Sequence, residues 1–357
     1  MSPVTGTALD LAAVLDARTT EGTLYERLDD DKVRCLACGH RCVIFPGRRG
    51  ICQVRFNEGG RLRVPWGYVA ALQCDPTEKK PFFHLLPGSK TLTFGMLGCD
   101  LHCPYCQNWL TSQALRDPVA GILPDDVSPE QLVALARRHG ARLLGSSYNE
   151  PLITTEWAVC VFRMAREAGL RTCFISNGNA TREVLTFLRP WCDGYKIDLK
   201  TMNQKGYRQL GGVLDRVLDT IKMVFGLGFW MEIVTLVIPG WNDSEEELGA
   251  AAEFIASVSP DIPWHVTAFH PDYKMQDYDS TSAATLVRAA RLGQAAGLRY
   301  VYAGNLPGRV GEFESTFCPN CRALLVERRG YHILQNHLSA TAGRCPRCGF
   351  QIPGIWA

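Results

Sequence analysis

The fold of this chain is decided by the stretch Gly98-Cys99-Asp100-Leu101-His102-Cys103-Pro104-Tyr105-Cys106. Its C-x3-C-x2-C spacing forms a short loop that can direct three thiolates at one point. Cysteine thiolates hold iron–sulfur clusters, and a [4Fe-4S] cluster normally takes four of them. Three protein ligands therefore leave one iron open to another molecule, just as a catalytic zinc site keeps one open position.

The sequence around this loop supports a catalytic cluster site. Residues 91–97 form a short apolar run that predicts a strand, and a (β/α) barrel places its chemistry at the ends of its strands. Tyr105 can cover the cluster with its ring and exclude water. The alternative is a structural zinc loop, for which His102 would have to supply a fourth ligand from inside the loop.

Short apolar runs alternate with helical patterns from residue 91 to about residue 304, which predicts parallel strands joined by crossover helices. The predicted strands are Thr91–Leu97, Arg142–Tyr148, Arg171–Ser176, Gly194–Leu199, Met231–Ile238, Trp264–Phe269 and Leu298–Tyr302. The predicted helices are Pro129–His139, Glu156–Ala168, Arg182–Leu188, Leu214–Leu227, Glu245–Val258 and Ala283–Ala296. We therefore predict an α/β fold, a partial or nearly complete (β/α) barrel of six or seven units.

Cysteine-rich segments flank the predicted barrel on both sides. We expect an N-terminal helix, around Leu9–Leu15, and a four-cysteine metal module in residues 1–64. The barrel should occupy residues 65–310, and a zinc-ribbon-like module residues 311–357.

Composition sets the outer limits on function. The 357 residues are 46% hydrophobic and 21% charged, as in an ordinary soluble protein. A net charge of +2 gives no strong basic field, no apolar run is long enough to span a bilayer, and the N-terminus shows no signal-peptide pattern. Eleven of the fifteen cysteines fall into three groups with metal-ligand spacing, which favours a reducing cytoplasm over disulfides. We expect a cytoplasmic protein that binds neither membrane nor nucleic acid.

The C-terminal group has the spacing of a zinc ribbon, two C-P-x-C knuckles about two dozen residues apart. Its ligands would be Cys318, Cys321, Cys345 and Cys348. Rubredoxin-like iron is the alternative metal. Zinc ribbons often bind nucleic acid and several arginines make this tail basic, but it has no ladder of aromatic residues on which bases could stack.

The N-terminal group has looser C-x2-C-x3-C-x9-C spacing. Its four candidate ligands are Cys35, Cys38, Cys42 and Cys52, and His40 is a possible replacement for one of them. Zinc is the first choice. The alternative is a second iron–sulfur cluster that relays electrons to the catalytic one.

Polar residues end several predicted strands, where a barrel binds its ligands. They occur in Ser147-Tyr148-Asn149-Glu150-Pro151, in Ser176-Asn177-Gly178, in Tyr195-Lys196-Ile197-Asp198-Leu199-Lys200 and at His270. Strand alternation puts Lys196, Asp198 and Lys200 on one face, and buried charges are costly unless they pair or bind a ligand. Glu232 is a lone carboxylate in an apolar strand, which we expect to face the cavity or an arginine.

The cysteine loop and its context resemble the radical S-adenosylmethionine (SAM) superfamily. In that superfamily the open iron of a [4Fe-4S] cluster chelates the amino and carboxylate groups of SAM. One electron then cleaves SAM to methionine and a 5′-deoxyadenosyl radical. The resemblance implies that Cys99, Cys103 and Cys106 hold the cluster and that the protein is an oxidoreductase or activase-like enzyme.

The resemblance also implies roles for strand-end residues. Asn149 and Glu150 lie where the superfamily has a G-G-E-P-like stretch that accepts from the SAM ammonium group. Ser176 and Asn177 resemble the T-N-G of glycyl-radical-enzyme activases, which contacts SAM, and His270 resembles an activase histidine that helps to hold it.

The segment ending at Lys200 resembles the D-L-K of the same activases. The resemblance implies that Lys200 pairs with the SAM carboxylate, with Asp198 as its orienting neighbour. The monovalent-cation site of these activases uses an aspartate where this chain has Ile175, so a cation site is not expected.

A narrower resemblance covers about residues 24–275. Leu24-Tyr25-Glu26-Arg27-Leu28, the N-terminal cysteines, Asp75-Pro76-Thr77-Glu78-Lys79-Lys80-Pro81 and Gln107-Asn108-Trp109 resemble the radical SAM member of the AmmeMemoRadiSam group. That group is related to pyruvate formate-lyase activating enzyme and implies Memo-family and AMMECR-family proteins as partners. A reduced flavodoxin or ferredoxin-type protein is the implied electron donor. The substrate stays open between a small molecule or peptide and a protein that receives a glycyl radical, and a zinc-stabilised binding module is the non-enzymatic alternative.

Overall fold

A computed structural model describes residues 10–357, so the predicted helix start at Leu9 lies outside the described residues. The central element is an eight-stranded sheet with the order β16-β15-β14-β13-β12-β11-β9-β8. Its strands are β8 (Ala71–Pro76), β9 (Lys90–Gly95), β11 (Ala141–Ser146), β12 (Arg171–Ser176), β13 (Gly194–Asp198), β14 (Trp230–Val237), β15 (Trp264–Ala268) and β16 (Val301–Gly304). Strands β9 and β11 to β16 are parallel, and β8 pairs antiparallel with β9.

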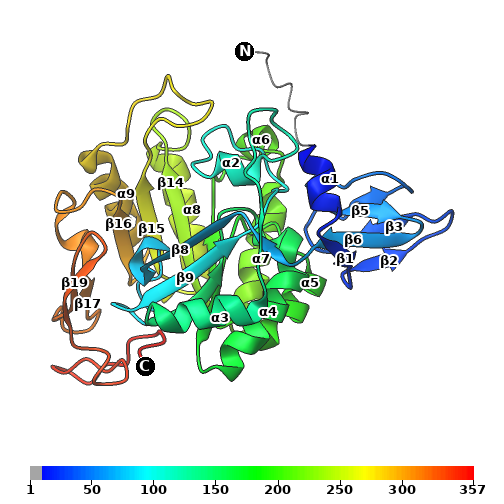
Figure 1. Cartoon of the computed structure of the whole chain (residues 1–357). Helices are drawn as coiled ribbons and strands as arrows, with labels where there is room; N and C mark the ends of the chain where they lie inside the picture. The colour runs from blue at the N-terminus through cyan, green and yellow to red at the C-terminus, as the bar shows by residue number, and fades with distance from the viewer. Residues whose placement is uncertain (1–9) are drawn as a thin grey trace, which may run out of the picture.

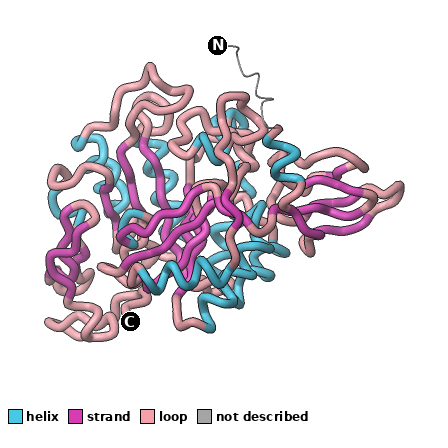
Figure 2. Tube along the Cα trace, viewed as in Figure 1, coloured by secondary structure: helices cyan, strands magenta, loops and turns pink. Residues whose placement is uncertain are grey.

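Helices follow the strands and cover the outer face of the curved sheet (Figures 1 and 2). They are α3 (Pro129–Arg138), α4 (Thr155–Glu167), α5 (Arg182–Leu188), α7 (Leu214–Gly226), α8 (Glu245–Val258) and α9 (Ala283–Ala295). Their starts follow ordinary capping chemistry: Ser128 forms a capping box with Gln131, and Ser244 accepts from the amide of Glu247. The predicted class, a partial (β/α) barrel with a mostly parallel sheet, is confirmed.

Aromatic packing joins the helical layer to the sheet. Phe162 on α4 lies with its ring centroid 6.3 Å from Phe94 on β9 and 6.3 Å from Phe174 on β12. All three side chains are fully buried. Burying a phenylalanine stabilises a fold by about 1.5–3 kcal/mol, so this cluster fixes α4 across two neighbouring strands.

Three of the elements of this region that were not predicted bear on the shape of the barrel. They are β8 and two short helices, α2 (Trp109–Ser112) and α6 (Gln204–Gln209). The last strand, β16, begins at Val301 and not at Leu298 as predicted. The amide of Leu298 instead donates to the carbonyl oxygen of Gly293, in the last turn of α9. Short polar segments of this kind have little hydrophobic periodicity, and tertiary contacts decide their conformation.

The N-terminal module is built from α1 (Leu11–Asp16) and two small antiparallel sheets. One sheet has the order β1-β6-β5 and the other β2-β3-β4. The strands are β1 (Thr19–Glu21), β2 (Tyr25–Arg27), β3 (Val33–Cys35), β4 (Val43–Ile44), β5 (Phe56–Glu58) and β6 (Arg61–Pro65). A further short pair, β7 (Tyr68–Val69) with β10 (Asp125–Asp126), lies at the edge of the barrel.

The C-terminal module is a three-stranded antiparallel sheet followed by a loop that returns to the barrel. Its strands are β17 (Thr316–Phe317), β18 (Leu324–Arg329) and β19 (His332–Asn336). Figure 1 shows this module, in orange and red, beside β16 and on the opposite side of the barrel from the blue N-terminal module. In the described part of the chain, no helix is long and apolar enough to cross a membrane.

The C-terminal module covers the seam between the two edge strands of the barrel, β8 and β16. Leu85, in the segment after β8, forms a parallel bridge with Ile355. His84 Nδ1 lies 2.7 Å from the carbonyl oxygen of Pro353, and Arg328 donates to the carbonyl of Phe83 at 2.8 Å. The end of the chain therefore packs against residues 83–85, below the sheet.

Candidate active site

The three cysteines of the loop after β9 lie in one cavity at the carboxyl ends of the parallel strands. Polar side chains from the ends of β11, β12 and β13 line the same cavity. The lining includes Cys99, Cys103, Cys106, Ser147, Tyr148, Asn149, Glu150, Ile175, Ser176, Asn177, Lys196, Asp198 and Lys200. The sequence therefore predicted most of the residues that the fold brings together here.

Gly98 fixes the start of the cysteine loop. Its φ is +95°, and a Cβ at this position would lie 3.0 Å from the carbonyl oxygen of Cys52 and 2.9 Å from Val54. Glycine tolerates both the positive φ and the close approach. The loop can therefore pack directly against the N-terminal module.

The three thiols suit a cationic metal cluster. Burial raises the pKa of Cys99 and Cys106, and it raises the pKa of Cys103 to about 12. A buried thiolate is costly by itself and needs positive charge beside it, which a metal cluster supplies. Two of the sulfurs have hydrogen-bond partners: the amide of Leu101 donates to Cys99 Sγ at 3.3 Å, and Ser112 Oγ lies 3.2 Å from Cys106 Sγ.

A largely buried charge cluster lines the same cavity as the cysteines. Asp198 accepts from Lys196 and, at 2.8 Å, from Lys200. Burial would raise the pKa of Asp198, but the two ammonium groups lower it to about 2. Two cations around one carboxylate leave a net positive charge, which complements an anion such as a carboxylate. The role of Lys200 toward SAM remains a prediction.

Glu150 connects two strand ends. Its oxygens accept from Ser176 Oγ at 2.7 Å, from the amide of Asn177 at 2.7 Å and from the amide of Leu152 at 3.1 Å. Burial, followed by the charge of Asp100, raises the pKa of Glu150. The carboxylate therefore holds the S-N-G turn in place, and its predicted contact with a SAM ammonium group is untested.

Asn149 fixes the end of β9. Its side-chain oxygen accepts from the amide of Met96 at 3.0 Å, and its amide group donates to the carbonyl of Glu150. This contact accounts for a buried asparagine at the strand end. Its predicted contact with SAM is likewise untested.

Asp100 is a site residue that the sequence analysis missed. Its two carboxylate oxygens accept from Asn177 Nδ2 and Asn179 Nδ2, each at 2.7 Å, and its side chain is fully buried. It ties the cysteine loop to the turn after β12. The available signal was a carboxylate inside the cysteine loop together with the Asn-Gly-Asn run at residues 177–179.

His270 lies outside the cavity that the cysteines line. Its side chain is exposed, and its Nε2 lies 2.9 Å from Nε2 of Gln107. The structure therefore places it at the barrel mouth beside Gln107, and its predicted contact with SAM is untested.

Glu232 faces neither the cysteine-lined cavity nor an arginine, so that expectation was wrong. It accepts from the amides of Phe83 and His84 at 2.9 Å and from Trp230 Nε1, and its Oε2 lies 2.7 Å from His265 Nε2. Backbone and aromatic donors satisfy this carboxylate. Glu232 therefore anchors the segment around Phe83 and His84, which forms the floor of the barrel.

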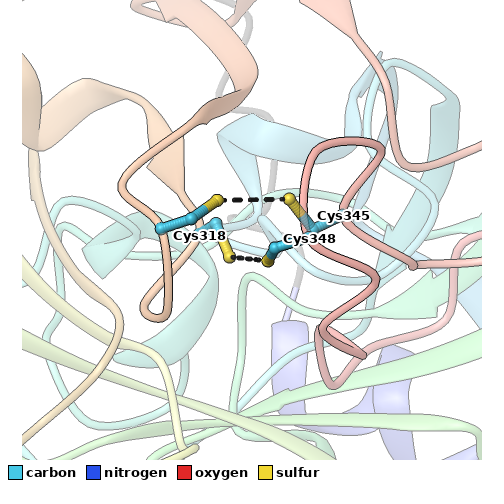
Figure 3. Close-up of side chains that lie close together, drawn as sticks. Cys318, Cys345 and Cys348 are labelled. Carbon is cyan, nitrogen blue, oxygen red and sulfur yellow. Dashed lines mark hydrogen bonds between the residues drawn. The ribbon is translucent and has the colours of Figure 1, made fainter.

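The four C-terminal cysteines meet at one point. Cys318 Sγ lies 3.6 Å from Cys348 Sγ, and Cys321 Sγ lies 3.6 Å from Cys345 Sγ (Figure 3). All four sulfurs lie within 4.8 Å of one another. This cluster could bind one metal ion, and thiolate donors suit zinc or iron.

The N-terminal cysteines are arranged differently. Within residues 10–357, the C-terminal group is the only set of three or more potential ligands whose donor atoms lie within 4.8 Å of one another. Cys35, Cys38, Cys42 and Cys52 are therefore more widely spread. Their module touches the catalytic loop, because His40 Nε2 lies 3.1 Å from the carbonyl oxygen of Asp100. The choice between zinc and a second cluster remains open.

Comparison with known proteins identifies the family. The radical SAM superfamily model matches residues 94–252. The chain is 37% identical over 335 residues to an uncharacterized protein, MJ0808, of Methanocaldococcus jannaschii, covering 93% of this chain and 98% of that protein. It is 28% identical to the pyruvate formate-lyase 1-activating enzyme of Escherichia coli K12 over 174 residues, 47% of this chain and 69% of that enzyme.

Solved structures show further similarities. A radical SAM methyltransferase from Sphaerobacter thermophilus aligns with a TM-score of 0.47 at 16% identity, covering 84% of this chain and 83% of that one. A domain of a pyruvate-formate lyase-activating enzyme from Bacteroides vulgatus aligns with a TM-score of 0.39 at 21% identity, covering 44% of this chain and 94% of that one. On the sequence matches, the chain belongs to the radical SAM superfamily and is homologous to the pyruvate formate-lyase activating enzymes.

Proposed function

We propose that this protein is an enzyme that cleaves SAM reductively and uses the resulting radical to abstract hydrogen from a small molecule or peptide. The observation that carries the proposal is the composition of one cavity. It joins three thiols to a charge cluster with net positive charge and to the polar ends of β11 and β12.

Each part of the cavity has a distinct task. Cys99, Cys103 and Cys106 would hold a [4Fe-4S] cluster, which when bound supplies the single electron for cleavage of SAM to methionine and a 5′-deoxyadenosyl radical. Lys200 would bind the SAM carboxylate, because its ammonium group is already oriented by Asp198.

The strand ends would complete SAM binding. Asn149, Glu150, Ser176 and Asn177 line the cavity beside the cysteines. They are linked by the hydrogen bonds of Glu150, so they form a preorganised rim for the amino and ribose groups. Buried Tyr105 lies against Trp241, with ring centroids 5.5 Å apart, and would keep water away from the thiolates.

The covered seam favours a small molecule or peptide over a glycyl radical protein. An activase must admit a folded protein's loop through an open side of the barrel. Here the turn of the C-terminal module at Gly330 and Tyr331 lies beside both Glu78, which follows β8, and the residues that follow β16. The activase alternative draws its support from relatives that are named pyruvate formate-lyase activating enzymes.

We further propose that the four C-terminal cysteines bind zinc. The proposed location is the cytoplasm, and the proposed electron donor is a reduced flavodoxin or ferredoxin-type protein. Membership of the AmmeMemoRadiSam group rests on the motif matches around residues 24–109. It would make Memo-family and AMMECR-family proteins the partners of this enzyme.

The test is an anaerobic assay on protein reconstituted with iron and sulfide. With dithionite as reductant, we expect SAM to be converted to 5′-deoxyadenosine and methionine. Alanine variants of Cys99, Cys103 and Cys106 should each abolish this conversion and lower the bound iron. Cys160→Ala, which changes a cysteine on α4 outside the three cysteine groups, is the matched control. SAM cleavage that persists in any of the three variants would refute the proposal.

A further inference from the structure

A groove runs along the seam between the barrel and the C-terminal module. Its upper hollow is lined by Gln107, His270 and Thr281, and its lower hollow by Glu78, His265 and Gly304. The two hollows share the wall formed by residues 305–307 and 330–331. The two hollows therefore lie next to each other along the seam.

The lower end of this groove holds a carboxylate with a free oxygen. Glu78 is 1% exposed, and its Oε1 accepts from the amide of Gly88 at 2.9 Å. Its Oε2 is buried and has no hydrogen-bond partner among residues 10–357. Glu314 lines the same hollow but is satisfied, because its oxygens accept from the amides of Gly308 and Gly330.

Neighbouring cations do not satisfy Glu78. The two Nη atoms of Arg328 donate instead to Thr316 Oγ1 and to the carbonyl of Phe83, and the ammonium group of Lys79 lies 3.1 Å from Asp75. Within residues 10–357, Arg328 Nε is, like Glu78 Oε2, buried without a hydrogen-bond partner. Burial raises the pKa of Glu78 in spite of the charge of Arg328. A buried acceptor without a partner is costly, so this oxygen is suited to a donor that arrives with a ligand.

We propose that the seam groove binds a substrate through an alkylammonium group that donates a charged hydrogen bond to Glu78 Oε2. This inference rests on the proposed function, because it names the chemical class that the enzyme would accept. The apolar parts of the ligand would lie against Leu306 and Tyr331, which line both hollows. The C-terminal module thereby becomes a wall of the substrate site.

The direction of the groove suits a reaction at the cysteine loop. Gln107, which lines the upper hollow, directly follows Cys106. A chain anchored by its ammonium group at Glu78 can extend along the groove and present its other end at the barrel mouth. The anchor would then lie in the lower hollow and the reacting part of the substrate in the upper one.

The experiment measures binding of a simple probe to the full-length, metal-loaded protein. Isothermal titration with n-butylammonium chloride should show binding to the wild type, and uncharged n-butanol should bind at least ten-fold more weakly. Glu78→Gln should weaken the binding of n-butylammonium by about ten- to a hundred-fold, because a charged hydrogen bond is lost. Glu312→Gln, an exposed carboxylate that pairs with Arg322, is the matched control and should bind like the wild type.

A second variant tests the groove without altering the carboxylate. Leu306→Trp adds bulk where the two hollows meet and should weaken the binding of n-butylammonium by at least ten-fold. Equal affinity in the wild type, Glu78→Gln and Leu306→Trp would overturn the inference, as would failure of the wild type to bind the probe.

The proposed function is tested separately on the wild type. SAM cleavage without n-butylammonium binding would overturn the groove inference alone. Binding of n-butylammonium that depends on Glu78, without any SAM cleavage, would overturn the proposed function.

Discussion

Asn177 Nδ2 donates to Asp100 Oδ1 at 2.7 Å, which joins the turn after β12 to the loop of three cysteines. The two residues are 77 positions apart in the chain. Asn179 donates to the other oxygen of the same carboxylate. The position of Cys99 thus depends on a buried contact between two separate strand ends.

Asp100→Asn should destabilise the metal-free protein by about 1–3 kcal/mol. The new amide group would face two asparagine donors, so at least one buried donor would lose its acceptor. Urea unfolding followed by circular dichroism measures the change. Asp219→Asn, an exposed carboxylate on α7, should stay within about 0.5 kcal/mol of the wild type. Equal stability of the two variants would show that the contact with Asn177 contributes nothing.

Lys200→Ala should raise the dissociation constant of SAM roughly ten- to a hundred-fold, because a charged hydrogen bond to a carboxylate contributes about 1.5–3 kcal/mol. Equilibrium binding of SAM to the reconstituted protein gives the value. Lys205→Ala, on the exposed face of α6, is the control. An unchanged dissociation constant in Lys200→Ala would mean that this ammonium group pairs only with Asp198.

Much of the barrel could be predicted because its signals are local. The parallel strands are short apolar runs, and serine caps such as Ser128 and Ser244 mark where helices begin. Strand β8 gave no such signal. Its residues are almost all half-buried, and its pairing with β9 decides its conformation.

The candidate site was predictable only where spacing carries the information. Cys99, Cys103 and Cys106 are evident from their spacing, and alternation along β13 grouped Lys196 with Asp198 and Lys200. The role of Asp100 depends on two asparagines brought near by folding, and no local pattern encodes that approach. Sequence reasoning likewise could not give the direction of the loop after β15, which carries His270 away from the cavity.

Acidification should weaken the attachment of the C-terminal module through His84. Burial lowers the pKa of His84 to about 4, and its neutral ring is bonded to Pro353 and Tyr302. The unfolded chain binds the proton below about pH 6.5 while the folded protein does not. The unfolded state therefore gains protons first, and the stability present at pH 7 falls as the pH drops toward 4, by up to roughly 3 kcal/mol.

Urea unfolding of the wild type and of His84→Gln at pH 7 and pH 5 isolates this contribution. The wild type should lose more free energy of unfolding between the two pH values than the variant does. If the free energy of unfolding changed by the same amount with pH in the two proteins, His84 would bind its proton equally well in the folded and the unfolded state.

The double variant Cys345→Ala, Cys348→Ala should lose one metal ion per chain, because it removes two of four sulfurs that lie within 4.8 Å of one another. Elemental analysis should report that ion as zinc. A module of this size depends on its metal, so trypsin should cut the tail of the variant faster than that of the wild type. SAM cleavage without substrate should continue, because the cavity that contains Cys99, Cys103 and Cys106 is lined by residues between 99 and 200 and by none of the C-terminal module. Loss of iron in place of zinc, together with loss of SAM cleavage, would instead identify the tail as a redox centre.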